Sequence, residues 1–360
     1  MSRSLSPGRL SSVGLASEMR ILFFPSDRGG GFGHISRCLC LARESRKRGH
    51  LCAFVSNSNK YRHILSGDYE VFPVHAIRRW DHRFLHRVAR IFSARRSISP
   101  VFTEFSGLDF QVIRDGFIDE ATIKQTLNQY IGIFKQFRPD ILISDTDLLA
   151  WILAQVVGCP VVQIVRYASH PSTAKLIWWK EIPEDLIPPN TTRLFNAILK
   201  EMRLPDIKKA PDLLQGDLYI VPSIPEIEPI PERQDTIFVG GLTISAADTD
   251  IPSQLLSMDS NEMLIYITIG GAAGNVGSKL FFSTIIRAFS EKNMRVVVST
   301  GQSFTPADFS DLPGNIHFYS WVPGQYLISR SHLVVFHGGY GTMMEAISCG
   351  KPTITIPFHT

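Results

Sequence analysis

The feature that most constrains this chain is a repeated order of strand, turn, helix and strand. An apolar run at 21–25 (ILFFP) leads into a glycine-rich turn, a helical pattern and a second apolar run at 51–56. The same order recurs with strands expected at 140–144 and 161–165, at 264–269 and 295–299, and at 333–336 and 353–356. Such alternation predicts parallel sheets covered by helices, the α/β class.

The length of 360 residues favours two domains over one, because a single core seldom organises so long a chain. A polar, acidic stretch that contains Pro252 separates two strand-like runs. We therefore predict an N-terminal domain at 19–243, a linker at 244–261 and a C-terminal domain at 262–360. Residues 1–18 are rich in serine and lack the apolar centre of a secretory signal, so we expect a disordered tail or a start codon assigned too early.

Composition excludes several classes of protein. Apolar residues make up 44% and charged residues 19%, which is typical of a globular chain. The net charge of +4 is too small for a dedicated nucleic-acid binder. The five cysteines form no CxxC pair, which favours reduced thiols and a cytoplasmic location. The apolar run 148–165 is interrupted by Gly158 and Pro160, so it predicts a buried helix followed by a strand and not a membrane span.

The strongest local signal is the segment 337–345 (HGGYGTMME), which leaves a predicted strand and opens a helix from about Thr342. Glycines there let the backbone approach a ligand, and a helix N-terminus offers N–H groups and partial positive charge. Together they suit a diphosphate. The alternative is that Thr342 and Glu345 form a capping box, which needs no ligand. The spacing leaves both interpretations open.

Three further residues are candidates for chemistry. Trp321 follows a predicted strand at 315–319 and could stack on a nucleobase, although spacing alone favours a core tryptophan. His34 stands at the start of a helix, where the helix dipole disfavours a protonated ring, as a general base requires. Asp145 ends its own strand and could orient that ring. With Asp147 it also suggests a metal site, but no third ligand is apparent.

The segment 321–357 resembles the donor-binding segment of UDP-glycosyltransferases. The likeness rests on Trp321-Val-Pro, the 337–345 motif, Gly350-Lys-Pro and Ile356-Pro. The nearest branch is the bacterial macrolide-type and glucuronosyltransferase-like group, which has two facing Rossmann-like sheets, the GT-B fold. Runs at 221–229, 238–242 and 265–271 are similar to the segments that close its first domain and open its second. The loop 30–34 (GGFGH) is closer to the lipid-linked N-acetylglucosaminyltransferase of cell-wall synthesis.

This resemblance implies an inverting, metal-independent transfer of a sugar from a UDP or dTDP sugar to an acceptor hydroxyl, without a cofactor. His34 would deprotonate the acceptor and Asp145 would steady the imidazolium. Trp321 would stack on the base, and Glu345 would accept hydrogen bonds from the ribose. The implied diphosphate side of the donor site comprises Gly33, Gly270, His337, Gly338, Gly339, Gly341 and Thr342.

Two departures from that family stand out. Pro323-Gly324-Gln325 replaces a Pro-Gln pair after the tryptophan. The chain also ends at Thr360, about where an acidic-Gln pair that contacts the donor sugar follows in the family. We therefore expect the second domain to be incomplete, which leaves the activity of this chain open.

The acceptor side is expected in a basic segment at 75–96. Trp80 and other apolar residues recur there at helical spacing, and Arg79, Arg83 and Arg87 follow one residue out of phase. Such a helix could contact an anionic membrane surface or a phosphorylated acceptor, or simply be a surface helix. The sequence does not decide whether the acceptor is a small molecule, a lipid-linked molecule or a glycan.

Two other functions stay open. The run from His34 to Leu39 (HISRCL) also resembles the loop of UDP-sugar hydrolases in bacterial nonulosonate pathways, in which water is the acceptor. A non-catalytic nucleotide-sugar binding protein is the third interpretation. A dehydrogenase is disfavoured, because no acidic residue ends the predicted strand 51–56.

Overall fold

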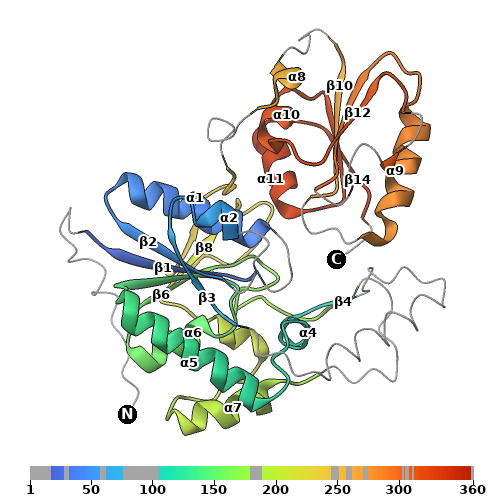
Figure 1. Cartoon of the computed structure of the whole chain (residues 1–360). Helices are drawn as coiled ribbons and strands as arrows, with labels where there is room; N and C mark the ends of the chain where they lie inside the picture. Colours follow the sequence, from blue (N-terminus) through green and yellow to red (C-terminus); the bar gives the residue numbers. More distant parts are fainter. Residues whose placement is uncertain are drawn as a thin grey trace.

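The computed structural model describes residues 18–27, 32–56, 62–75, 105–178, 189–244, 251–256, 262–270, 275–301, 304, 308–309 and 312–357. Within these ranges the chain forms two α/β units, each built on a parallel sheet covered by helices (Figure 1). The predicted fold class is confirmed.

The first unit contains a seven-stranded parallel sheet in the order β3-β2-β1-β5-β6-β8-β9. Its strands are β1 (Arg20–Pro25), β2 (Leu51–Ser56), β3 (Glu70–Pro73), β5 (Ile141–Asp145), β6 (Val161–Ile164), β8 (Leu218–Val221) and β9 (Thr236–Phe238). In the pairing of β1 with β5, Pro25 stands opposite Asp145. The segments that follow these two strands therefore begin at the same carboxyl edge of the sheet.

Helices pack on both faces of this sheet. They are α1 (Gly33–Lys47), α2 (Arg62–Leu65), α4 (Leu108–Arg114), α5 (Glu120–Phe137), α6 (Ala150–Val157), α7 (Thr192–Glu201) and the 3₁₀ helix η2 (Ala210–Leu214). Two short strands, β4 (Phe105–Ser106) and β7 (Ile177–Trp178), pair antiparallel beside them. One hydrophobic cluster lies under α1 and another surrounds α6.

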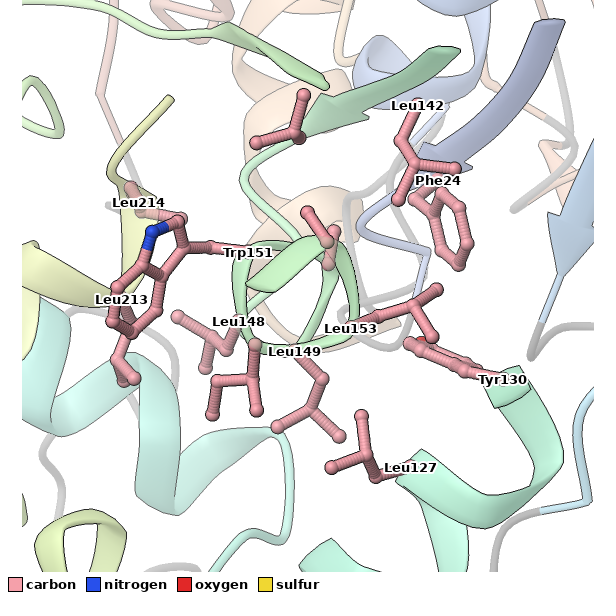
Figure 2. Close-up of a cluster of buried hydrophobic side chains, with 14 of the residues drawn as sticks. Phe24, Leu127, Tyr130, Leu142, Leu148, Leu149, Trp151, Leu153, Leu213 and Leu214 are labelled. Atoms are coloured by element: carbon pink, nitrogen blue, oxygen red, sulfur yellow. The ribbon is translucent and has the colours of Figure 1, made fainter. Parts of the chain in front are cut away.

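The larger cluster is built around the first half of α6, where Ala150 to Ala154 are all apolar and buried. Figure 2 shows Trp151 and Leu153 of this helix projecting to opposite sides, Leu153 toward Tyr130 of α5 and Trp151 toward Leu213 of η2. A helical turn that is apolar all round needs to be buried on all sides, as this one is. The helix ends at Gly158, whose φ of 69° is left-handed, and β6 follows. The predicted helix and strand at 148–165 are confirmed, and no described helix is long and apolar enough to cross a membrane.

The second unit contains a five-stranded parallel sheet in the order β12-β11-β10-β13-β14. Its strands are β10 (Leu264–Thr268), β11 (Arg295–Ser299), β12 (Ile316–Tyr319), β13 (Leu333–Phe336) and β14 (Thr353–Thr355), and its helices are α9 (Asn275–Phe289), α10 (Gly324–Arg330) and α11 (Tyr340–Ser348). The short helix α8 (Ser253–Leu256) lies in the stretch predicted as a linker. Its Leu255 is buried in the core of the second unit.

The two units meet at α11. The Tyr340 hydroxyl donates to the carbonyl of Pro222 at 3.3 Å, and the Ser223 hydroxyl lies 3.9 Å from the sulfur of Met344. Gly241 packs closely on the same methionine, since a Cβ there would stand 3.2 Å from the Met344 Cβ. Figure 1 shows α11 on the side of the second unit that faces the first sheet. The start of α11 is therefore held against segments that follow the strands of the first unit.

The packing around α6 yields a prediction for stability. Leu153 is fully buried in the larger cluster, whereas Leu280 of α9 is 70% exposed. Leu153→Ala leaves a cavity, so we expect it to lower the free energy of unfolding by about 2–5 kcal/mol. Leu280→Ala is the control and should change it by less than about 0.5 kcal/mol. Urea unfolding measures both; equal effects of the two substitutions would contradict the packing described.

Candidate functional site

The carboxyl edge of the first sheet brings His34 and Asp145 together. His34 is the second residue of α1, and its Nδ1 lies 2.8 Å from Oδ1 of Asp145, the last residue of β5. The imidazole is 31% exposed, whereas the carboxylate is 1% exposed. The imidazole ring of His34 is therefore accessible to solvent, whereas the Asp145 carboxylate that it contacts is buried.

Arg37 stands one helical turn after His34 and binds the same carboxylate. Its Nε donates to Oδ2 of Asp145 at 2.7 Å, and its Nη2 donates to Oδ1 at 3.0 Å. Nη2 also lies 3.0 Å from Nδ1 of His34. Residues three apart are neighbours on a helix surface, so both side chains reach Asp145 from one face of α1. The carboxylate is thus fixed in one orientation.

The charge of Asp145 follows from this arrangement. Burial alone would raise the pKa of its carboxyl, but the charges of Arg37 and His34 and their hydrogen bonds bring the pKa down to about 2. The ionised carboxylate can only accept, so the short contact requires the proton on Nδ1 of His34. When the ring is neutral, its Nε2 keeps the lone pair that a general base requires.

The two residues after Asp145 also shape this edge. Thr146 has a φ of 56°, which is strained for a β-branched residue, and its carbonyl accepts from Nε2 of Gln111 at 3.0 Å. Asp147 accepts from the Tyr130 hydroxyl at 2.8 Å and from the N–H groups of Leu149 and Ala150 at 3.0 Å. Its carboxylate therefore caps the start of α6. Among the described residues no group of three His, Cys, Asp or Glu could hold a metal ion.

In the second unit, His337 follows β13 and is buried between two glycines. A Cβ at Gly270 would stand 2.7 Å from Cε1 of His337, and a Cβ at Gly339 would stand 2.5 Å from it. Gly270 and Gly338 also have left-handed φ values of 66° and 94°. Two of the predicted glycines are thus required by the packing of the His337 ring. Gly341 differs, because a Cβ there would meet open space.

The helix after this loop begins earlier than the sequence predicts. Helix α11 starts at Tyr340, its N-cap is Gly339, and no side chain caps it. The capping box of Thr342 and Glu345 is therefore wrong, because Thr342 already lies inside the first turn. The first N–H groups of a helix have no partner within the helix. Within the described part of the chain no side chain caps these N–H groups, which include that of Gly341, so an anion could bind them.

Glu345 lies one turn further into α11. Burial raises the pKa of its carboxyl to about 7. A Cβ at Gly324 would stand 3.2 Å from Oε2 of Glu345. Gly324 is the residue that departs from the expected Pro-Gln pair, and its lack of a side chain leaves room for this carboxylate.

Trp321 and Gly33 complete the predicted donor set. Trp321 is 49% exposed. The interpretation of it as a core tryptophan is therefore wrong, and its indole is open to a ligand. Gly33 is the first residue of α1, and a Cβ there would stand 3.6 Å from Nη1 of Arg37.

The predicted acceptor residues lie outside the described part of the chain. This holds for Trp80 and for the three arginines Arg79, Arg83 and Arg87. A pocket of about 210 Å³ on the first unit is lined by none of the predicted site residues; its lining includes Asp109, Lys175 and Lys209.

Sequence reasoning missed three residues. Arg37 could have been found from the sequence, because it lies three residues after His34 on a predicted helix and therefore on the same face. Tyr340 and Arg166 were not, because they meet across the two units: the Arg166 guanidinium lies 4.6 Å from the centre of the Tyr340 ring. This contact connects the edge that carries His34 with the start of α11.

Comparison with known proteins shows which class of proteins this chain resembles in sequence and fold. Residues 268–360 match the Glycosyltransferase family 28 C-terminal domain. Solved glycosyltransferases share the fold: SnogD from Streptomyces nogalater has a TM-score of 0.67 at 17% identity over 94% of this chain and 82% of its own. The calicheamicin glycosyltransferase CalG4 has a TM-score of 0.63 at 17% identity over 95% of this chain and 80% of its own. The two-sheet GT-B fold is confirmed.

Particular relatives are similar in sequence. The NDP-glycosyltransferase YjiC of Bacillus subtilis (strain 168) is 26% identical over 66% of this chain and 60% of its own length. The oleandomycin glycosyltransferase of Streptomyces antibioticus is 25% identical over 68% and 57%. An uncharacterized glycosyltransferase of Methanosarcina acetivorans is 22% identical over 94% and 79%. The chain thus spans less than two thirds of the length of the Bacillus and Streptomyces relatives.

The resemblance to macrolide-type glycosyltransferases inferred from the sequence is confirmed by these relatives, whereas the likeness of the loop 30–34 to the lipid-linked N-acetylglucosaminyltransferase stays a prediction. The chain is related to nucleotide-sugar glycosyltransferases, including macrolide-type ones, and shares their fold. The enzyme class predicted from the sequence, a glycosyltransferase, is the class of these relatives. The roles of individual residues stay predictions.

The charge of Asp145 predicts a pH dependence of stability. Its pKa of about 2 in the folded chain lies below the ordinary 3.8, so it stabilises the fold fully above about pH 4 and loses this effect as the pH falls toward 2. The difference in free energy of unfolding between the wild type and Asp145→Asn should therefore shrink over that range, by at most about 1.4 kcal/mol per pH unit. Asp68→Asn, at an exposed ion pair, is the control. A difference that stays constant with pH would contradict this account.

The packing of His337 predicts a second effect on stability. Gly270→Ala adds a Cβ that collides with His337, whereas Gly350→Ala adds one in open space at a similar φ of 61°. Both substitutions carry the cost of a left-handed φ, about 1–2 kcal/mol. We expect Gly270→Ala to cost about 1–3 kcal/mol more in urea unfolding, because only it overpacks the ring. Equal costs would show that the ring moves aside freely.

Proposed function

We propose that this chain transfers a sugar from a nucleotide-diphosphate donor to an acceptor hydroxyl, with inversion and without a metal. The observation that carries the proposal is the hydrogen-bonded pair of His34 and Asp145, 2.8 Å apart, on an edge whose neighbouring segments contact the uncapped start of α11. One side supplies a base and the other supplies N–H groups for an anion. This combination suits a displacement in which a phosphate leaves.

His34 and Asp145 form the base side of the proposed site. Nε2 of His34 accepts the proton of the acceptor hydroxyl as its oxygen attacks C1 of the sugar. The ring becomes an imidazolium, which the ionised carboxylate of Asp145 stabilises through the Nδ1–H bond. The bond from C1 to the diphosphate oxygen breaks on the opposite face, so the configuration at C1 inverts. The electron pair of that bond leaves with the diphosphate.

The donor side of the proposed site would stabilise the negative charge of the leaving diphosphate. The N–H groups at the start of α11, His337 and the partial positive charge of the helix would hold the diphosphate. The half-exposed indole of Trp321 offers a face for the base. Glu345 offers carboxylate oxygens for the ribose hydroxyls.

The relatives guide the choice of substrates. One structural neighbour, the spinosyn rhamnosyltransferase SpnG, was solved in complex with thymidine diphosphate, so UDP and dTDP are the first donors to test. Names such as oleandomycin glycosyltransferase favour a small-molecule acceptor. The basic segment 75–96 also leaves a lipid-linked acceptor, a glycan acceptor and peripheral contact with the inner face of a membrane as predictions. We further predict a cytoplasmic protein that uses no cofactor.

Nucleotide binding is the first experiment. Calorimetric titration with UDP and with dTDP should show binding by the wild type, and His337→Ala should weaken it by about tenfold or more, because a contact to the diphosphate is lost. His317→Ala, in β12 of the same unit, is the control and should bind as the wild type does. No binding of either nucleotide by a folded wild type would contradict the proposed donor site.

Turnover then separates the three functions. His34→Gln should bind nucleotide normally and reduce sugar transfer by about 10²–10⁴-fold, because the base is lost. Release of free sugar without an added acceptor, dependent on His34, would instead identify a hydrolase. Binding without any turnover, unaffected by His34→Gln, would identify a binding protein.

A further inference from the structure

Arg166 lies between the two halves of the proposed site. It follows β6 at the carboxyl edge of the first sheet. Its guanidinium lies 4.6 Å from the centre of the ring of Tyr340, the first residue of α11. The electrostatic neighbours of Arg166 are Arg37, Asp145, Glu228 and Tyr340. This arginine therefore belongs to the same neighbourhood as both the His34 pair and the start of α11.

The carboxylates near Arg166 are engaged with other groups. Asp145 accepts two hydrogen bonds from Arg37 and one from His34. Glu228 accepts the N–H of Tyr167 at 2.6 Å. Over the described residues, the guanidinium of Arg166 makes no hydrogen bond and no ion pair; its side chain lies over the Tyr340 ring. An arginine carries five N–H donors, and these are left for a ligand.

The environment of Arg166 disfavours its positively charged form. Burial and the positive charge of Arg37 lower the pKa of the Arg166 guanidinium, and Glu228, Tyr340 and Asp145 offset this only in part. A cation that is desolvated and lies beside another cation gains free energy when an anion binds to it. The planar guanidinium suits a phosphate or a carboxylate, which it can bind with two parallel hydrogen bonds.

We propose that Arg166 binds an anionic group of the substrate, a phosphate or a carboxylate, between the His34 pair and the start of α11. The inference rests on the proposed function for the identity of that substrate. The anion has two sources: the diphosphate of the donor, which would then be held by both units, or an acidic group on the acceptor. Both have the same chemistry at the guanidinium.

The test uses Arg166→Met and Arg166→Lys in the full chain. Arg330→Met is the matched control, because Arg330 also lies over a tyrosine ring, 3.9 Å from the centre of Tyr326, in the second unit. UDP, dTDP and uridine are titrated into each protein by calorimetry. Inorganic phosphate is then titrated into protein with and without saturating UDP. Thermal unfolding shows whether each variant is folded.

The expected result is that Arg166→Met weakens binding of UDP or dTDP by about tenfold or more and leaves uridine unchanged, whereas Arg166→Lys weakens it less. That outcome assigns the anion to the donor diphosphate. Unchanged nucleotide affinity, with phosphate binding to the UDP-loaded wild type lost in Arg166→Met, assigns it to the acceptor.

Two further outcomes separate this inference from the proposed function. If the wild type binds phosphate through Arg166 but binds neither nucleotide, the anion site stands and the proposed donor is wrong. If Arg166→Met binds nucleotide and phosphate as the wild type and Arg330→Met do, the anion site is overturned and the proposed function is untouched.

Discussion

The arrangement at the first sheet depends on an ionised carboxylate that is kept inside the protein. Asp145 is 1% exposed, and an isolated buried charge would cost several kcal/mol. Two hydrogen bonds from Arg37 and one from His34 offset that cost. Because Arg37 and His34 both belong to α1, the helix, the strand β5 and the ring orientation are fixed by one set of contacts. Loss of Arg37 or of Asp145 would leave the other buried charge without its main partner.

The second unit is organised by a different constraint, the volume of one imidazole ring. His337 occupies space that Cβ atoms at Gly270 and Gly339 would need, so two loops from different strands close on it. The glycines that suggested a close ligand are in part packing residues. Of the five glycines predicted for the donor site, only Gly341 faces open space. The anion binding proposed for this loop therefore depends mainly on the uncapped helix and less on the glycines.

Local patterns were enough to predict the fold, and long-range contacts limited prediction of the site. The apolar run at 21–25 predicts a strand, and β1 is Arg20–Pro25, because five of its six residues are buried in a sheet covered on both faces. The capping box failed because the extended backbone of Gly339, and not the motif, sets where α11 begins. The exposure of Trp321 depends on which elements pack against it. The contact of Arg166 with Tyr340 joins segments that no local pattern connects.

Tyr340 shows how the two halves of the site are coupled. It lies within the glycine motif, yet its hydroxyl donates to Pro222 of the first unit and its ring supports Arg166. The proposed inverting displacement needs the base and the leaving group on opposite faces of one carbon, so for that proposal the position of α11 relative to His34 matters as much as either group. Contacts from the tyrosine, and from Met344 one turn later, set that position. Tyr340 thus belongs to the glycine motif of one unit and also contacts the other unit.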